Sequence, residues 1–400
     1  MIIIAFEFVL ASTVGLLSFL LCVELIVGAL SFSQKRRRIC NLEAVKNVIL
    51  IPAHNESQVI AKTIKNLEQQ KLENDVIVVV ADNCNDDTSS VCRALGAKVL
   101  ERFSEKQKGK GYALDFGTKW ILDNLEFDNL VLFDADCLFT DGSYKQLISS
   151  VIEEKLICQA VYLMKAVESE PKTKIAEFTW WLKNAVRAKG LDTLKIGCHI
   201  QGSGIAFPRK VLASINFASG SIVEDLELGL KLSIGKNRVK FAPNSTVISH
   251  FPASNEGLSE QRKRWEHGHM DTITKSPTFF ISAFNSKSFR AVFLILDAVI
   301  PPLFAYLIIL ISLLITGYIL QFFGYTVLWL SMLSNNLFVL LSLTIVWLIK
   351  GRTVLKPTDI PKIFSFILDK IGVYSSFAKG RQTTWVRTSR EDEKDEKNKD

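Results

Sequence analysis

The sequence predicts an α/β protein whose mostly parallel sheet is flanked by transmembrane and interfacial helices. Between about residues 45 and 255, short apolar runs rich in β-branched residues alternate with helical stretches, a pattern typical of a parallel sheet covered on both faces. Polar clusters directly follow three of these runs. Long apolar segments lie on both sides of this region, and the hydrophobic share of 48% is high for a soluble chain.

The first element is the apolar segment Phe8–Ser33, which exceeds the roughly 20 residues that a bilayer crossing requires. A signal peptide carries its basic residues before the apolar run, whereas here the basic run Lys35–Arg38 follows it and the only early charge is Glu7. Basic clusters stay on the cytosolic side of a membrane. We therefore predict an uncleaved anchor over residues 1–33 with its C-terminal end in the cytosol.

The sheet region is expected to hold five elements in its first half, namely a strand at 47–52, a helix at 57–70, a strand at 75–81, a helix at 111–124 and a strand at 129–133. In sheets of this kind, ligands bind beyond the carboxyl ends of the strands. The three strands end in the polar clusters Ala53–Glu56, Asp82–Asp87 and Asp134–Asp136. One acidic residue at a strand end is commonly a turn residue, but three successive clusters predict a binding site.

Asp134 and Asp136 form the most specific of these clusters. A turn after the strand would let both carboxylates approach one ligand, and a hard divalent cation such as Mg²⁺ or Mn²⁺ prefers such oxygen ligands and bridges phosphate oxygens. A solvated surface pair is the alternative for an isolated motif of this type. The position at a strand end favours the metal site.

Two further apolar segments, Ala298–Phe323 and Thr326–Ile349, are expected to cross the membrane with a tight turn at Gly324 between them. Lys350 and Arg352 follow, so this basic cluster predicts the same topology as the first one. Buried helices of a soluble domain are the alternative, which the length of the apolar pair disfavours.

Polar and charged residues outside the candidate site indicate which partners the chain contacts and which kinds of site it lacks. Glu24, Asn335 and Asn336 lie inside the membrane segments and are expected to make helix–helix contacts. The formal net charge is +7, with much of the excess beside membrane segments, which indicates anionic lipid headgroups rather than nucleic acid. The seven cysteines form no C-x-x-C pair, which argues against a disulfide framework or a zinc site.

Short motifs follow one another in a fixed order through the middle of the chain. They are Ile51–Glu56, Asp82, Lys108–Leu114, Asp134-x-Asp136, Gly202–Phe207, Glu224-Asp225 and Gln261–Trp265, with Trp385–Arg390 near the end. In this order they resemble the family-2 glycosyltransferases, particularly the membrane-bound synthase branch that includes cellulose, hyaluronan and poly-N-acetylglucosamine synthases. The resemblance covers about residues 45 to 270 and implies a nucleotide-sugar-binding domain of the GT-A type.

The resemblance also implies roles for the donor side of the site. Asp82 would hold the base or ribose of the nucleotide, helped by the turn from Pro52 to Glu56. Asp134 and Asp136 would place the diphosphate and its Mg²⁺ or Mn²⁺, and Lys110 would lie near the donor phosphates. A leaving nucleoside diphosphate gains negative charge, which a cation and basic side chains stabilise.

On the acceptor side, the resemblance makes Asp225 the general base, and a positioned carboxylate contributes about 10²–10⁴ in rate to such a step. Gly202, Glu224 and the set Gln261, Arg264 and Trp265 would shape the acceptor and diphosphate end. The alternative for Glu224-Asp225 is the first turn of a helix, where acids are favoured; both can hold. The alternative for Gln261–Trp265 is a basic amphipathic helix on the membrane.

Several residues keep more than one interpretation. His250 is a candidate third metal ligand, although a strand-end histidine bonded to backbone is slightly favoured. His267 and His269 are expected on the surface of the interfacial helix. Trp180 and Trp181 would either line an acceptor groove or rest on the membrane.

The expected organisation is an N-terminal anchor (1–33), a cytosolic GT-A domain (34–255), an interfacial helix region (256–292), two transmembrane helices (293–350), an amphipathic and basic segment (351–390) and a disordered tail (391–400). Val223 stands where many synthases have threonine. The membrane segments are fewer than in synthases that carry their polymer through their own channel. Export by this chain would therefore need a homo-oligomer or a partner protein.

The sequence thus predicts an inverting glycosyltransferase that transfers a sugar from a nucleotide-sugar to a growing polysaccharide at the cytosolic face of the cell membrane. The expected nucleotide-sugar is a UDP-sugar. The expected partners are the donor, a glycan or lipid acceptor and membrane lipids. Transfer of one sugar to a membrane lipid, as in ceramide glucosyltransferases, is the runner-up. A non-catalytic membrane scaffold is the third possibility, which the intact acidic set disfavours.

Overall fold

The computed structural model describes residues 2–31, 41–167, 172–221, 223–252, 255–363 and 366–367. Four sequence predictions fall outside these residues: the basic run Lys35–Arg38, the segment Trp385–Arg390, the tail 391–400 and most of the amphipathic segment after Ile363.

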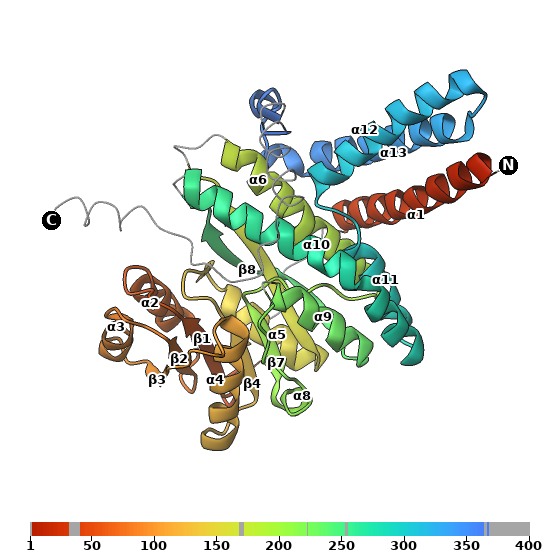
Figure 1. Ribbon diagram of the computed structural model, residues 1–400. Helices are drawn as coiled ribbons and strands as arrows, with labels where there is room; N and C mark the ends of the chain where they lie inside the picture. The colour runs from red at the N-terminus through yellow and green to blue at the C-terminus, as the bar shows by residue number, and fades with distance from the viewer. Residues whose placement is uncertain are drawn as a thin grey trace.

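An eight-stranded sheet lies at the centre of the described chain (Figure 1). Its strands are β1 (Asn47–Ala53), β2 (Val76–Asp82), β3 (Lys98–Arg102), β4 (Asn129–Leu132), β5 (Leu138–Phe139), β6 (Ile157–Lys165), β7 (Ile205–Pro208) and β8 (Val239–His250). Their order in the sheet is β3-β2-β1-β4-β7-β6-β8-β5. β1 pairs in parallel with β2 and β4, β2 with β3, and β6 with β8, whereas β7 and β5 run antiparallel to their neighbours. The predicted mostly parallel sheet is confirmed.

Helices cover both faces of this sheet because successive residues of a strand point to opposite sides. Ile49 and Ile51 of β1 belong to one apolar core, which also contains Ile64 of α2. Val48 and Leu50 belong to the other, together with residues of α4. The helices of this domain are α2 (Ile60–Gln70), α3 (Thr88–Ala94), α4 (Lys110–Asn124), α5 (Ser143–Glu154), α6 (Lys172–Trp181), the π-helix η1 (Leu182–Arg187), α7 (Ala188–Thr193), α8 (Arg209–Leu212) and α9 (Glu224–Ile234).

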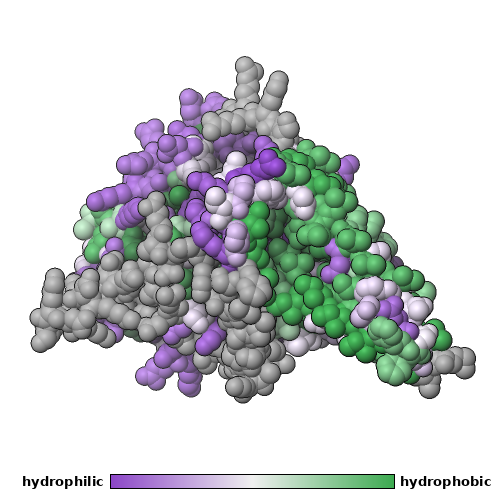
Figure 2. Space-filling view, turned by 90° about the horizontal axis from the view of Figure 1, so that it is seen from above, coloured by the Kyte–Doolittle hydropathy of each residue, from purple (hydrophilic) through white to green (hydrophobic). Residues whose placement is uncertain are grey.

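The remaining helices are α1 (Ile2–Leu30), α10 (Asn255–Asn285), α11 (Phe289–Ala298), α12 (Leu303–Leu320), α13 (Val327–Ile349) and the short 3-10 helices η2 (Gln321–Phe323), η3 (Gly351–Thr353) and η4 (Pro357–Asp359). Three spans, Ile3–Leu30, Leu303–Phe323 and Val327–Ile349, are long and apolar enough to cross a membrane. Figure 1 shows α1, α12 and α13 together, with the N-terminus and the α12–α13 turn at the end far from the sheet. Figure 2 shows hydrophobic side chains gathered over this part of the molecule. The chain is a membrane protein.

The membrane helices begin at other residues than the sequence predicted. The segment expected from Ala298 is divided, because α11 ends at Ala298 and α12 starts only at Leu303. Pro301 and Pro302 separate the two helices, since a proline lacks an N–H and disfavours helical geometry in the residue before it. At the N-terminus the helix extends back past Glu7, whose side chain is buried and accepts a hydrogen bond from the Leu328 amide at 3.4 Å.

Two of the polar residues within these helices, Asn336 and Glu24, make helix–helix contacts. The Asn336 side-chain amide donates to the Leu310 carbonyl at 3.2 Å and so joins α13 to α12, as predicted. Glu24 accepts a hydrogen bond from Arg187 of η1 at 3.1 Å, so it joins α1 to the sheet domain. Glu24 thus makes the predicted helix–helix contact, with η1 as its partner.

Candidate active site

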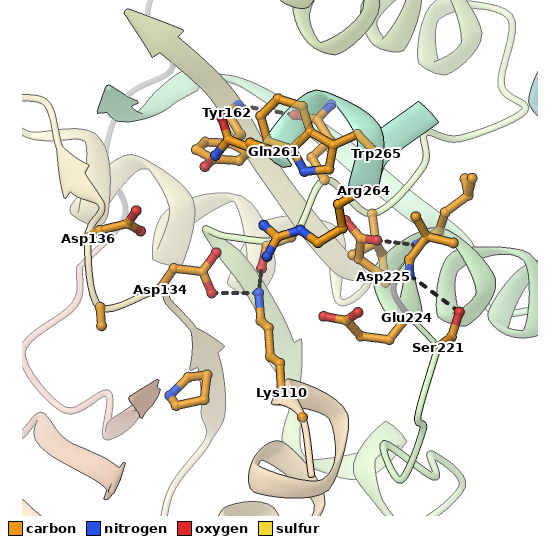
Figure 3. A pocket seen from close by; sticks show the side chains of 18 of the residues that line it. Lys110, Asp134, Asp136, Tyr162, Ser221, Glu224, Asp225, Gln261, Arg264 and Trp265 are labelled. Carbon is orange, nitrogen blue, oxygen red and sulfur yellow. Dashed lines mark hydrogen bonds and ion pairs between the residues drawn. The ribbon is translucent and has the colours of Figure 1, made fainter. Parts of the chain in front are cut away.

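A single cavity of about 1200 Å³ opens at the carboxyl ends of β1, β2 and β4 and extends towards η1 and α11. Every site residue assigned from the sequence lines it, namely Pro52, Glu56, Asp82, Lys110, Asp134, Asp136, Gly202, Glu224, Asp225, Gln261, Arg264 and Trp265. Residues separated by more than 200 positions therefore share one chamber. Figure 3 shows how part of this set converges.

The acidic pair after β4 forms the metal-binding candidate. Ligand atoms of Asp134, Asp136 and the buried Cys137 lie within 4.8 Å of one another. The Asp134 amide donates to the Ser203 hydroxyl at 3.0 Å, which fixes the turn. His250 lines the same cavity but does not belong to this group of ligand atoms.

Lys110, the first residue of α4, connects this pair to the rest of the site. Its ammonium lies 2.5 Å from Asp134 Oδ1 and donates to the Gly202 carbonyl at 2.8 Å. Burial lowers the pKa of Lys110, but the carboxylates of Asp134 and Glu224 outweigh burial and hold that pKa above its ordinary value. Lys110 is therefore a fixed positive charge beside the metal-binding candidate (Figure 3).

Asp82, at the end of β2, is held by an ion pair that the sequence did not reveal. Its Oδ1 accepts hydrogen bonds from Arg102 Nη1 at 2.6 Å and from Asn83 Nδ2 at 3.1 Å. Both partners of the ion pair are 8% exposed. Arg102 lies opposite Asp82 in the β2–β3 register, so only the strand pairing could have identified it. Arg102 thus orients the carboxylate of Asp82, which can only accept hydrogen bonds, in the wall of the cavity.

Asp225 and Glu224 open α9, so the two interpretations of this pair, helix start and cavity wall, both hold. Asp225 Oδ1 accepts a hydrogen bond from the Leu226 amide at 2.8 Å. Burial and the adjacent carboxylate of Asp225 raise the pKa of Glu224 to about 7. Gly202 faces this pair with a φ of +98°, and a Cβ there would lie 3.3 Å from Asp225 Oδ2. Glycine thus satisfies the backbone conformation and leaves room for the carboxylate.

An aromatic cluster of Tyr162, Trp180 and Trp265 also lines the cavity. The rings of Trp180 and Trp265 have centroids 4.6 Å apart, and Tyr162 meets Trp180 edge-on at 5.8 Å. Trp180 Nε1 donates to the Tyr162 carbonyl at 3.0 Å. Trp180 therefore lines the cavity, whereas Trp181 packs on Phe178 and the core between the membrane helices. The two tryptophans therefore have different surroundings, and the packing of Trp181 in a protein core matches neither of the two predicted locations.

Charged residues that the sequence analysis did not single out line the end of the cavity next to α1. Arg187 bonds Glu24 and also Asp297 of α11, whose other oxygen is 2.7 Å from His199 Nε2. Lys183 lies one turn before Arg187. The one available signal was two cations four residues apart in an otherwise apolar helical stretch.

The prediction that His267 and His269 lie on the surface of α10 was wrong. His267 is 6% exposed, and His269 lines the cavity with its Nε2 3.0 Å from the Ile300 carbonyl. Burial and the charge of Lys183 lower the pKa of His269 to about 3, so its ring is neutral. The helix packs against α9 and α11, which encloses both histidines.

Comparisons with known proteins agree with this geometry. A family model described as glycosyltransferase like family 2 matches residues 47–268. The chain is 23% identical over 300 residues to a poly-beta-1,6-N-acetyl-D-glucosamine synthase of Staphylococcus aureus strain COL, over 70% of this chain and 67% of that protein.

Two solved structures are also similar. One is a mannosyltransferase from Pyrobaculum calidifontis in complex with GDP-Man and Mn²⁺, at 16% identity and a TM-score of 0.47, over 81% of this chain and 99% of that chain. The other is a glucosyl-3-phosphoglycerate synthase from Mycobacterium tuberculosis, at 19% identity and a TM-score of 0.38, over 58% and 80%. The matched family region covers more than half of the chain and contains every site residue assigned from the sequence; this protein is a family-2 glycosyltransferase with a GT-A-type fold.

Proposed function

We propose that this protein is an inverting transferase that moves a sugar from a UDP-sugar to a growing polysaccharide, with its catalytic domain in the cytosol. The observation that carries the proposal is the single cavity, which holds a metal-binding candidate, Lys110, Asp225 and an aromatic cluster. The likeness to a poly-β-1,6-N-acetyl-D-glucosamine synthase supports a polymer product.

The donor side suits a nucleoside diphosphate. Asp134 and Asp136 fit Mg²⁺ or Mn²⁺, because their oxygens come together at a strand end and hard cations prefer oxygen ligands. A bound metal ion would supply charge neutralisation for the diphosphate. Lys110 adds a positive charge at the same place. Asp82, held by Arg102, offers a carboxylate oxygen to an N–H or O–H donor of the nucleotide.

The acceptor side suits a hydroxyl nucleophile. Asp225 takes the proton as the acceptor oxygen bonds to the anomeric carbon, and the bond from that carbon to the diphosphate oxygen breaks. One base without a carboxylate nucleophile corresponds to one displacement and inversion. The faces of Trp265 and Trp180 offer an apolar surface to the acceptor sugar ring.

A cytosolic active site is supported by the basic residues that follow α13. Lys350 and Arg352 come directly after the helix, and such residues favour the cytosolic side. Nucleotide-sugars would reach the cavity from that compartment.

A second candidate, transfer of one sugar to a membrane lipid, is favoured by a specific contact. Arg187 lines the cavity and bonds Glu24 of the membrane helix α1, so the acceptor end of the chamber lies beside the bilayer anchor. A lipid hydroxyl could reach Asp225 from there.

Sizing the product separates these candidates. Purified full-length protein would be incubated with a panel of radiolabelled UDP-sugars and Mn²⁺, with Asp225→Asn as the inactive control. A distribution of chain lengths supports the polysaccharide synthase, and one sugar on an extractable lipid supports the second candidate. No transfer from any UDP-sugar under conditions where the protein is folded would contradict both.

A further inference from the structure

Lys183 is a charged side chain in the cavity for which the proposed reaction gives no role. It lies on η1, lines the chamber and is exposed to it. It makes no hydrogen bond or ion pair with any residue that the structure describes. Arg187, one turn further along, is instead engaged by Glu24 and Asp297. Lys183 is therefore available to a ligand, and Arg187 is not.

The charges around Lys183 leave its ammonium without a carboxylate in contact, among the residues that the structure describes. Burial lowers the pKa of Lys183, Asp225 and Asp297 oppose that shift, and Arg187 adds to it. The Lys183 ammonium faces the open cavity, where water solvates it. A negatively charged ligand group at this point would replace that water with a charge-assisted hydrogen bond.

The position of η1 relative to α1 indicates where that ligand comes from. A Cβ on Gly28 would lie 2.0 Å from the Val186 carbonyl oxygen, and one on Gly190 would lie 2.1 Å from the Glu24 carbonyl oxygen. The backbones of η1 and α7 thus lie directly against the last turns of α1. Glu24 precedes the end of α1 at Leu30 by six residues, or about 9 Å along a helix.

The position of this contact along α1 corresponds to the depth of the lipid headgroups in a bilayer. The 28-residue span of α1 is about 42 Å long at 1.5 Å per residue. A hydrocarbon core is only about 30 Å thick, and about 40–45 Å includes the headgroup layers. The last turns of α1, and with them Lys183, therefore lie at the level of lipid phosphates. Leu191 and Leu226 line the same end of the cavity and offer an apolar wall to the lipid chain.

We propose that the acceptor end of the cavity is a phosphate subsite, in which Lys183 contacts the phosphate of a membrane lipid whose acceptor hydroxyl faces Asp225. This inference rests on the proposed function, because it takes Asp225 as the mark of the acceptor end. It adds a substrate class, a phosphate-bearing lipid acceptor, whether that lipid receives one sugar or carries a growing chain.

Binding of three matched probes to the full-length protein tests the subsite. The probes are dioctanoyl phosphatidic acid, dioctanoylglycerol, which has the same chains without phosphate, and inorganic phosphate. Titration calorimetry in uncharged detergent micelles would measure affinities for the wild type, Lys183→Gln, Lys183→Arg and the control Lys119→Gln. Lys119 is an exposed residue of α4, paired with Asp115 and outside the cavity.

The expected result is that phosphatidic acid binds the wild type more tightly than dioctanoylglycerol does. Lys183→Gln should weaken phosphatidic acid binding by about tenfold or more, as for a lost hydrogen bond to a charged group, and leave dioctanoylglycerol unchanged. Lys183→Arg should stay within a few-fold of the wild type, as should Lys119→Gln. Equal affinities for the two lipids, or an unchanged Lys183→Gln, would overturn the subsite. Inorganic phosphate binding as tightly as phosphatidic acid would overturn the lipid as its source.

Turnover of a UDP-sugar in the same preparations separates this inference from the proposed function. Transfer that persists without charge-dependent lipid binding would refute the subsite alone. Absence of any transfer, with lipid binding that depends on Lys183, would refute the enzymatic proposal and leave the subsite standing.

Discussion

The ammonium of Lys110 lies 2.5 Å from Oδ1 of Asp134 and joins the start of α4 to the turn after β4. The same nitrogen also donates to the Gly202 carbonyl, and Gly202 lies against the carboxylate of Asp225. One lysine therefore links the metal-binding candidate to the candidate base. This arrangement leads to predictions for each of the two sides.

Asp225→Asn is expected to leave UDP binding nearly intact and to lower turnover by a factor of about 10² or more. The asparagine side chain keeps the shape of the aspartate but cannot act as a general base. Single-turnover transfer and UDP titration on the same preparation measure the two effects. Activity within a few-fold of the wild type would show that the base is another residue.

Removal of divalent metal is expected to abolish transfer, and Mn²⁺ or Mg²⁺ should restore it. Asp136→Ala should not be rescued at ordinary metal concentrations, because it deletes one of two oxygen ligands at the strand end. Transfer assays across a metal titration test this. Full activity in excess chelator would assign the acidic pair a purely structural role.

Gly202→Ala is expected to lower activity by about tenfold or more, because it combines backbone strain with a methyl group 3.3 Å from Asp225 Oδ2. Gly96→Ala is the matched control. Gly96 also has a positive φ, of +84°, but nothing lies within 4 Å of its Cβ position. Both variants should lose thermal stability, and only Gly202→Ala should lose turnover. An equal loss of activity in the two would attribute the effect to strain alone.

Glu224 is expected to make stability fall as pH rises. Its pKa of about 7 lies above the ordinary 4.5, so the native state holds the proton more firmly than the unfolded state does. The contribution of Glu224 to the free energy of unfolding is about 3 kcal/mol. It is fully present below about pH 4.5 and is lost as pH rises through about 7. Apparent Tm values from pH 4.5 to 8 in chelator, for wild type and Glu224→Gln, test this. A pH dependence that is the same in both would contradict the assignment.

Thiol labelling is expected to reach a cysteine at Gly324 only from outside the cell, and one near Lys350 only after the membrane is opened. The turn at Gly324 and the basic residues after α13 lie at opposite ends of that helix. Single-cysteine variants on a background without native cysteines provide the measurement. The reverse pattern would place the active site away from cytosolic nucleotide-sugars.

The sequence allowed three acidic residues of the cavity to be predicted because they directly follow buried strands. Asp82, Asp134 and Asp136 had to meet at one sheet edge once the strands were parallel. Arg102 could not be found in this way, because its position opposite Asp82 depends on the register between β2 and β3. Charge pairs across strands are properties of pairing and not of either strand alone.

The end of the cavity beside η1 and α10 was predictable only where motifs marked it. Lys183 and Arg187 lie on a π-helix, whose wider turn moves side chains away from the faces that a period of 3.6 residues assigns. The histidines of α10 were misplaced because the packing of that helix against α9 and α11 is a tertiary contact that its own sequence does not reveal.

The bond between Glu24 and Arg187 has a consequence for attempts to isolate the catalytic domain. Deleting α1 would remove one of the two carboxylates that hold Arg187 and would uncover the backbone surface on which Gly28 and Gly190 pack. The membrane anchor thus supports the helices η1 and α7, whose residues line the cavity, as well as tethering the domain. A truncated, water-soluble fragment would be a damaged enzyme, and inhibitor screens on this protein require the intact chain in a bilayer or detergent.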